Sequence, residues 1–170
     1  IEENYGKKIS FEKFDYNDPD VLKMFARADT LGVFQFESSG MRAFLKELKP
    51  DEFSDLVAAN ALFRPGPMKQ IPKFVGSKHD KNKISYLHPK LEPILKSTYG
   101  CIVYQEQVMQ IVQQIGGYSL GRADIVRRAI SKKKMKVMEE ERKNFIYGNV
   151  EEEVSGAIAN GVDEKTANEI

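Results

Sequence analysis

The chain has 170 residues, of which 41% are hydrophobic and 30% are charged, with a formal net charge of +1. This composition is typical of a folded soluble protein and argues against disorder. No stretch approaches the roughly 20 apolar residues of a membrane span, and no signal-peptide pattern begins the chain. Because Cys101 is the single cysteine, the chain can form neither an internal disulfide nor a zinc site with several thiolates. We therefore expect the protein to act in a reducing cytoplasm. The start at Ile1, without Met, and the end at Ile170, in a predicted helix, suggest a piece cut from a longer chain.

The apolar spacing predicts a mostly α fold with one or two short strands. Capping residues and prolines place most helix boundaries, as where Asp18 precedes Pro19. The stretch 68–86 reads as a basic loop with one short helix near Lys73. Strands are predicted over 31–36 and 101–104, and helices over 19–27, 38–49, 51–61, 88–96, 106–116, 119–133, 135–147, 151–160 and from 163 onward.

Positive charge is concentrated between Gly121 and Met138, where seven basic residues face Asp124 as the one acidic residue. This stretch therefore carries +6, and the rest of the chain carries −5. Because salt limits each charge to about 10 Å of influence, the local excess predicts an anionic partner near this segment. The basic residues are Arg122, Arg127, Arg128, Lys132, Lys133, Lys134 and Lys136.

The helical spacing of this segment separates an apolar side from a basic one. Ala123, Val126, Ala129 and Ile130 share the side expected to pack on the domain. The arginine pair and the lysines point to the solvent, where an arginine fork can hold two oxygens of a polyphosphate and a lysine supplies a mobile charge. A simple solvated helix face is the alternative, and it is the commoner explanation of a basic helix.

Three other segments carry candidate binding residues. Arg64 lies between Phe63 and a rigid Pro-Gly-Pro turn, where it serves either a ligand or a structural ion pair. Tyr104 and Gln105 lie at a predicted strand–helix junction. Tyr104 either stacks on a base or belongs to the core. Gln105 either faces a cleft or caps the helix. The basic loop either binds along a nucleic-acid backbone or is an ordinary surface loop. Its basic residues are Lys69, Lys73, Lys78, His79, Lys81 and Lys83.

The sequence shows no pattern typical of a catalytic or metal site. Asp18 and Asp20 have an Asp-x-Asp spacing, but the proline between them at a helix start is better explained by capping. His79 and His88 lack partners at metal-ligand spacing, and no phosphate-cradling Gly-x-x-x-x-Gly-Lys loop is present. Cys101 lies in an apolar run and is predicted to be an inert core residue.

Several ordered motifs resemble the C-family of bacterial replicative polymerases, the DNA polymerase III alpha subunits. The resemblance extends from about Asp18 to Gly148. Its motifs are the runs LGVFQFESSGM (31–41), ALFRPGP (61–67), YG (99–100), VYQEQVMQ (103–110), GYSLG (117–121), AD (123–124), RRA (127–129) and KKK (132–134).

The resemblance implies a helical fingers module over 18–148, after a polar lead-in over 1–17 and before a truncated helical continuation over 149–170. In this family the palm aspartates that bind catalytic Mg²⁺ lie upstream, so this chain should hold neither metal nor catalytic residue. The arginine pair and the lysine run match the family's site for the triphosphate of an incoming deoxynucleotide. That site maps onto Arg127, Arg128, Lys132, Lys133 and Lys134, with Arg64, Tyr104 and Gln105 lining the cleft.

Two residues depart from the family pattern: Arg122 and Ser131 both stand where the family often has glycine. The resemblance further implies primer-template DNA as a partner, contacted by Lys73, Lys78 and His79, and other replicase subunits bound through regions outside this chain. It implies no membrane and a bacterial cytoplasmic location. A freestanding nucleic-acid-binding or protein-interaction module is the alternative.

Overall fold

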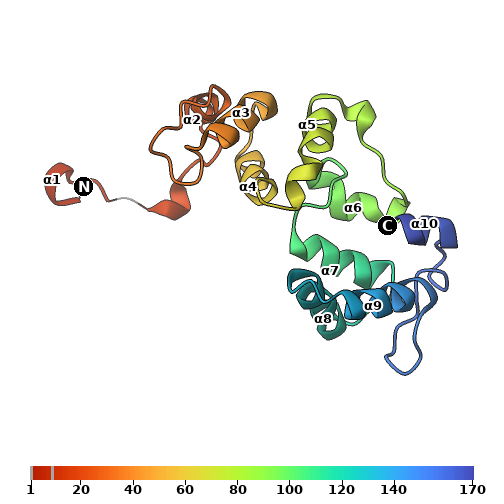
Figure 1. The fold of residues 1–170 in the computed structure, drawn as a ribbon. Helices are drawn as coiled ribbons and strands as arrows, with labels where there is room; N and C mark the ends of the chain where they lie inside the picture. The colour runs from red at the N-terminus through yellow and green to blue at the C-terminus, as the bar shows by residue number, and fades with distance from the viewer. Residues whose placement is uncertain (1, 9) are drawn as a thin grey trace. The chain divides into compact units, whose positions relative to one another are not determined.

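A computed structural model describes residues 2–8 and 10–170, and these residues form ten α-helices that Figure 1 traces in chain order. The chain divides into two compact units, Ile1–Pro65 and Gly66–Ile170, hereafter the N-terminal and C-terminal units. No helix among the described residues is long and apolar enough to cross a membrane. The ten helices that the structure describes confirm the prediction of a mostly α fold.

The N-terminal unit packs three helices after α1 (Glu2–Tyr5). They are α2 (Pro19–Ala26), α3 (Ser39–Leu48) and α4 (Phe53–Leu62), with α3 in contact with both others. Asp18 caps α2 by accepting hydrogen bonds from the backbone N–H groups of Asp20 (2.9 Å) and Val21 (3.3 Å). The Asp-x-Asp spacing is thus explained by capping, as predicted.

The C-terminal unit contains α5 (Ile71–His79), α6 (Glu92–Leu95), α7 (Gln105–Gln114), α8 (Leu120–Ser131), α9 (Met135–Tyr147) and α10 (Glu164–Glu169). Helix α8 packs against α7 and α9, and these three helices lie side by side in Figure 1. Short 3-10 turns complete the secondary structure of both units: Phe11–Lys13, Pro67–Gln70, Lys81–Lys83, Pro89–Leu91 and Lys96–Thr98.

Two clusters of buried side chains hold the C-terminal unit together. One joins α6 and α10 to the inner faces of α7 and α9, and it includes Ile111, Ile115 and Ile146. The other joins α7 to α8 and includes Val112, Tyr118 and Val126. Burial of large apolar side chains such as these stabilises a fold by about 1.5–3 kcal/mol each, and α8 contributes its apolar side to the second cluster.

Neither predicted strand forms. At 31–36 two consecutive turns replace it, with left-handed backbone at Gly32 (φ 80°) and Gln35 (φ 67°). At 101–104 the backbone groups form hydrogen bonds with side chains instead of with a neighbouring strand. The Gln107 side-chain oxygen accepts from the N–H groups of Val103 (2.8 Å) and Tyr104 (3.0 Å), and the Thr98 hydroxyl donates to the Cys101 carbonyl (2.6 Å). The one β-bridge among the described residues joins Asn149 to Val154.

The short helix predicted near Lys73 in the stretch 68–86 is confirmed as α5, and Pro72 lies in its first turn, where no backbone N–H is needed. The helix predicted over 151–160 is absent. There the N–H of Gly156 donates to the Gly116 carbonyl (2.9 Å) and that of Ala157 to the Phe145 carbonyl (2.7 Å), which takes these donors away from a local helix.

Candidate functional site

Helix α8 presents the arginine pair. The Ser119 hydroxyl caps the helix by accepting from the N–H of Arg122 (3.3 Å). Ala123, Val126 and Ala129 are buried beneath it, as their spacing predicted. Ile130, predicted for the same side, is instead 41% exposed and lies at the rim of an apolar cavity. The buried stripe fixes the rotation of α8 and thereby turns Arg127 and Arg128 outward.

Arg127 and Arg128 share a single carboxylate. Asp124 Oδ1 accepts from Arg127 Nε (2.8 Å) and Nη2 (2.7 Å), and Asp124 Oδ2 lies 2.5 Å from Arg128 Nη2. The hydrogen bond from Arg127 is the main reason that the pKa of Asp124 is lowered. The Arg128 side chain is 66% exposed and that of Arg127 32%, so one acid leaves a net positive charge on an accessible surface.

The first residue of α7 approaches the same arginine. Gln105 Oε1 accepts from Arg127 Nη1 (3.1 Å), and Gln105 Nε2 donates to the Ser131 hydroxyl (3.3 Å). Ser131 in turn donates to the backbone carbonyl of Arg127 (2.9 Å). The structure therefore brings the predicted residue Gln105 to the arginine pair. Tyr104 is half-buried at the N-cap of α7, where Gln107 holds its backbone N–H.

The three lysines lie at the end of α8. Lys133 has a left-handed backbone (φ 51°), its N–H donates to the Ile130 carbonyl (3.1 Å), and the N–H of Lys134 donates to the Ala129 carbonyl (3.0 Å). This pattern is a Schellman closure with lysine at the position where glycine is usual. All three lysines are exposed, and Lys132 and Lys134 line a hollow with Arg128. The helix C-terminus also favours cations at this place.

We expect Lys133→Gly to stabilise the C-terminal unit by about 1 kcal/mol, because glycine adopts the left-handed backbone without steric cost. Lys133→Ala is the matched control, since it removes the same charge but keeps the Cβ atom. Urea unfolding of both variants separates the two effects. Equal midpoints for the glycine and alanine variants would show that backbone strain at Lys133 is not significant.

Arg122 does not belong to this basic surface, contrary to the expectation that it adds charge there. Its side chain is 18% exposed and pairs with Glu141 (2.6 Å) and Glu152 (2.9 Å). The Tyr118 hydroxyl donates to the same Glu141 carboxylate (3.0 Å), and burial with this carboxylate raises the pKa of Tyr118. Arg122 thus anchors α8 to α9.

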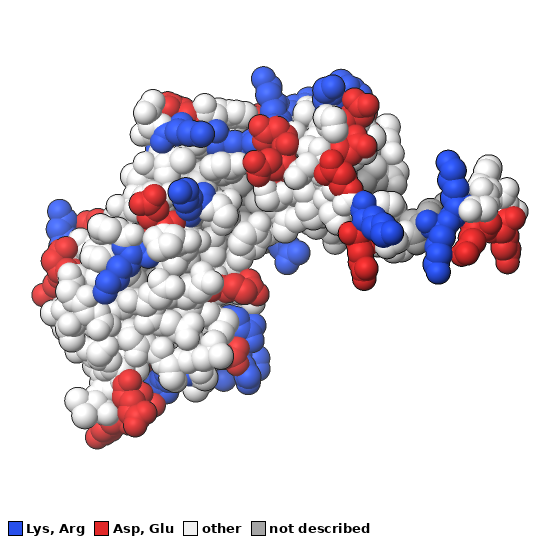
Figure 2. All heavy atoms as spheres, turned by 180° about the vertical axis from the view of Figure 1, so that it is seen from behind, with Lys and Arg blue, Asp and Glu red and all other residues white. Residues whose placement is uncertain are grey.

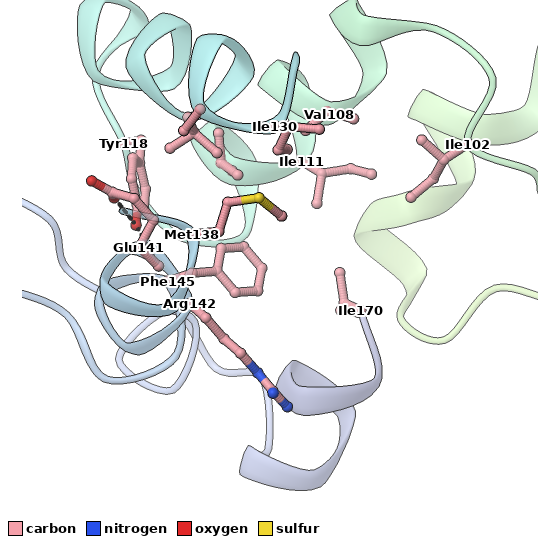
Figure 3. A pocket seen from close by; sticks show the side chains of 13 residues that line it. Ile102, Val108, Ile111, Tyr118, Ile130, Met138, Glu141, Arg142, Phe145 and Ile170 are labelled. Carbon is pink, nitrogen blue, oxygen red and sulfur yellow. Dashed lines mark hydrogen bonds between the residues drawn. The ribbon is translucent and has the colours of Figure 1, made fainter. Parts of the chain in front are cut away.

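A cavity of about 190 Å³ lies between α7, α8 and α9, and Figure 3 shows its lining. Its walls are mainly apolar, with Met138 and Phe145 toward the centre. Arg142, at the edge, donates to the Asn168 side chain (3.0 Å). Because this cavity lacks the arginine pair and the lysines, it does not suit a polyphosphate. The outward hollow beside Arg128 is lined by this arginine, by Lys132 and Lys134, and by three apolar residues.

The remaining predicted residues lie elsewhere. Lys73 and His79 are exposed on α5, whereas Lys78 is half-buried with its ammonium 5.7 Å from the centre of the Tyr99 ring. Arg64 is exposed in the turn that ends the N-terminal unit. On the face that Figure 2 shows, acidic and basic side chains are interspersed. A continuous basic stripe is therefore not a feature of that face.

The described residues include no group of three or more His, Cys, Asp or Glu side chains that could hold a metal ion. Cys101 is 1% exposed, which confirms its predicted core position, and burial raises the pKa of its thiol. A raised thiol pKa disfavours the reactive thiolate.

Comparison with known proteins gives a consistent result. Residues 1–153 match the family described as the bacterial DNA polymerase III alpha subunit finger domain. The DNA polymerase III subunit alpha of Staphylococcus aureus (strain Mu50) is 50% identical over 148 residues, or 87% of this chain and 14% of that protein. The subunit alpha of Halalkalibacterium halodurans is 48% identical over 170 residues, or 100% of this chain and 14% of that protein. The chain thus spans about a seventh of the length of these relatives.

Proposed function

Because the chain belongs to the finger-domain family of the bacterial DNA polymerase III alpha subunit, we propose that it binds the triphosphate of an incoming deoxynucleotide during template-directed DNA synthesis. The observation that carries this proposal is the accessible arginine pair of α8, balanced by one carboxylate and followed by three exposed lysines. The site residues are Arg127, Arg128, Lys132, Lys133 and Lys134, with Gln105 beside them.

The chemistry of nucleotide addition explains why such a surface is useful. The primer 3′-hydroxyl attacks the α-phosphorus, and pyrophosphate leaves with increased negative charge. Cations held beside the β- and γ-phosphates favour that charge, and they act by position and electrostatics without forming a covalent bond. An arginine fork can bind two phosphate oxygens, and the lysines add charge without demanding a fixed geometry.

We further propose that the carboxylates for the catalytic Mg²⁺ ions lie in a palm region outside this chain. Metal ions bound there would stabilise the attacking and leaving oxygens. The chain alone would then be inactive in synthesis, and its part would be to hold the nucleotide. Primer-template DNA would contact α5 through Lys73 and His79, and Arg64 and Tyr104 would each contribute to nucleotide binding. Other replicase subunits would bind elsewhere, and the enzyme would act in the bacterial cytoplasm.

Of the three residues predicted to contact DNA, Lys78 is the weakest candidate. Its ammonium lies over the Tyr99 ring, and the interaction between a cation and an aromatic face holds it toward the unit. Lys73 and His79 are exposed on the same helix and remain in the proposal. The DNA-contacting part of α5 is therefore reduced to these two positions.

Lysine acetylation of a full-length alpha subunit that carries this sequence tests the nucleotide proposal. The enzyme is stalled on a dideoxy-terminated primer with the complementary deoxynucleotide. We expect Lys132 and Lys134 to become several-fold less reactive than in the complex with DNA alone. Lys165, exposed on α10, is the matched control and should not change.

The same experiment separates the alternative, a module that binds nucleic acid or protein without a nucleotide role. That module would show protection by DNA alone, with a steep dependence on salt and no response to the nucleotide. Equal reactivity of Lys132 and Lys134 in all complexes would exclude both forms of binding at the end of α8.

A further inference from the structure

We infer that Gln105 and Asp124 are positioning residues that hold the Arg127 guanidinium in one orientation for the triphosphate. This inference rests on the proposed nucleotide site; it adds Asp124 to that site, and it assigns Gln105 a role that acts through Arg127. Asp124 holds the Nε–Nη2 edge of the guanidinium at 2.8 and 2.7 Å. Gln105, from the neighbouring helix, accepts from Nη1 at 3.1 Å.

The contacts with Asp124 and Gln105 hold two different edges of the Arg127 guanidinium. A planar guanidinium on a flexible stem has several rotamers, and each rotamer aims its donors differently. Contacts from α8 itself and from α7 together define the plane of the group. Gln105 is itself held, because its amide donates to Ser131, whose hydroxyl donates to the Arg127 carbonyl. The remaining N–H donors of Arg127 then already point in a fixed direction, so binding of the triphosphate does not have to order the side chain further.

The charge of Asp124 makes this role testable. A carboxylate beside a triphosphate weakens binding by repulsion, so charge alone argues against an acid at this position. Orientation gives a reason for its presence, since the carboxylate lies where both arginines of the pair reach it. The positioning role and the charge-balancing role therefore predict different effects on the maximal rate when Asp124 becomes neutral.

The test measures single-turnover nucleotide incorporation by a full-length alpha subunit that carries this sequence. For Asp124→Asn we expect the maximal rate to fall about tenfold while the apparent nucleotide dissociation constant does not rise. If Asp124 only balances charge, the dissociation constant falls and the maximal rate is unchanged. That result overturns the role of Asp124.

Gln105 is tested by a double-mutant cycle with Arg127. Gln105→Ala alone should lower the maximal rate about fivefold to tenfold, and in the Arg127→Ala background it should cost less than about twofold. Additive losses would overturn the role of Gln105. Gln110→Ala, exposed on the same helix, is the matched control for general effects on α7.

The cycle also distinguishes failure of this inference from failure of the proposed function. No effect of Arg127→Ala itself would remove the nucleotide site, and the positioning roles would fail with it. A large effect of Arg127→Ala with no effect of Gln105→Ala and Asp124→Asn would leave the nucleotide site in place and remove the positioning roles. Thermal melting of each variant confirms that the subunit is folded.

Discussion

Replacing Arg127 and Arg128 together by alanine is expected to lower kcat/KM for the incoming nucleotide about 10²- to 10⁴-fold in a full-length alpha subunit that carries this sequence. Each arginine can form a charge-assisted hydrogen bond to phosphate worth about 1.5–3 kcal/mol, and each 1.4 kcal/mol is a factor of ten. The apparent affinity for primer-template DNA should change little, because the proposal assigns both side chains to the triphosphate. Single-nucleotide incorporation kinetics measures both quantities.

Conservative and remote variants make this prediction specific. Arg128→Lys keeps the charge but loses the planar fork, so its loss should lie between those of wild type and Arg128→Ala. Arg142→Ala removes an exposed arginine of α9 that bonds to Asn168, and it should leave nucleotide kinetics unchanged. Unchanged nucleotide kinetics in both single variants, Arg127→Ala and Arg128→Ala, would contradict the assignment.

The sequence was sufficient to predict the elements that depend on local pattern. The buried stripe of Ala123, Val126 and Ala129 follows from helical spacing, and the cap at Asp18 follows from the residue types at a helix start. These features are set by neighbours within one or two helical turns. The outward direction of Arg127 and Arg128 could therefore be predicted before the fold was known.

The sequence was insufficient where backbone groups find distant or unusual partners. The apolar run at 101–104 has the composition of a strand, but Gln107, which is 5% exposed, satisfies its N–H groups through a side chain. Gly156 has left-handed backbone (φ 84°), and a Cβ atom there would lie 2.3 Å from the Gly148 nitrogen. Only glycine tolerates such a close approach of two backbone segments, and the periodicity of apolar residues in the sequence does not predict it.

The candidate site shows the same division. Its arginines and lysines could be found from charge density and from the family resemblance, but the contact between Gln105 and Arg127 joins two helices and depends on their packing. Arg122 was counted with the basic cluster because its acidic partners, Glu141 and Glu152, are distant in sequence. Charge counting along a chain cannot separate a cation that faces a ligand from one that holds two helices together.

Replacing Arg122 by alanine is expected to destabilise the C-terminal unit by about 3 kcal/mol, because the substitution leaves a buried carboxylate without its cation. The Glu141 side chain is 7% exposed, and Tyr118 can supply only one hydrogen bond to it. Urea unfolding of the chain, monitored by circular dichroism, measures the loss. Glu152→Ala should cost less than about 1 kcal/mol, since that partner is 46% exposed.

A double variant separates the cost of an unpaired charge from the cost of lost packing. In Arg122→Met with Glu141→Leu, both charges are replaced by apolar groups, and the Tyr118 hydroxyl keeps its hydrogen bond to the Glu141 backbone carbonyl (3.0 Å). We expect this variant to be more stable than Arg122→Ala, because no buried charge is left unpaired. If Arg122→Ala unfolds at the wild-type urea concentration, the ion pair does not hold α8 on α9. The outward direction of the arginine pair would then depend on the apolar stripe of α8 alone.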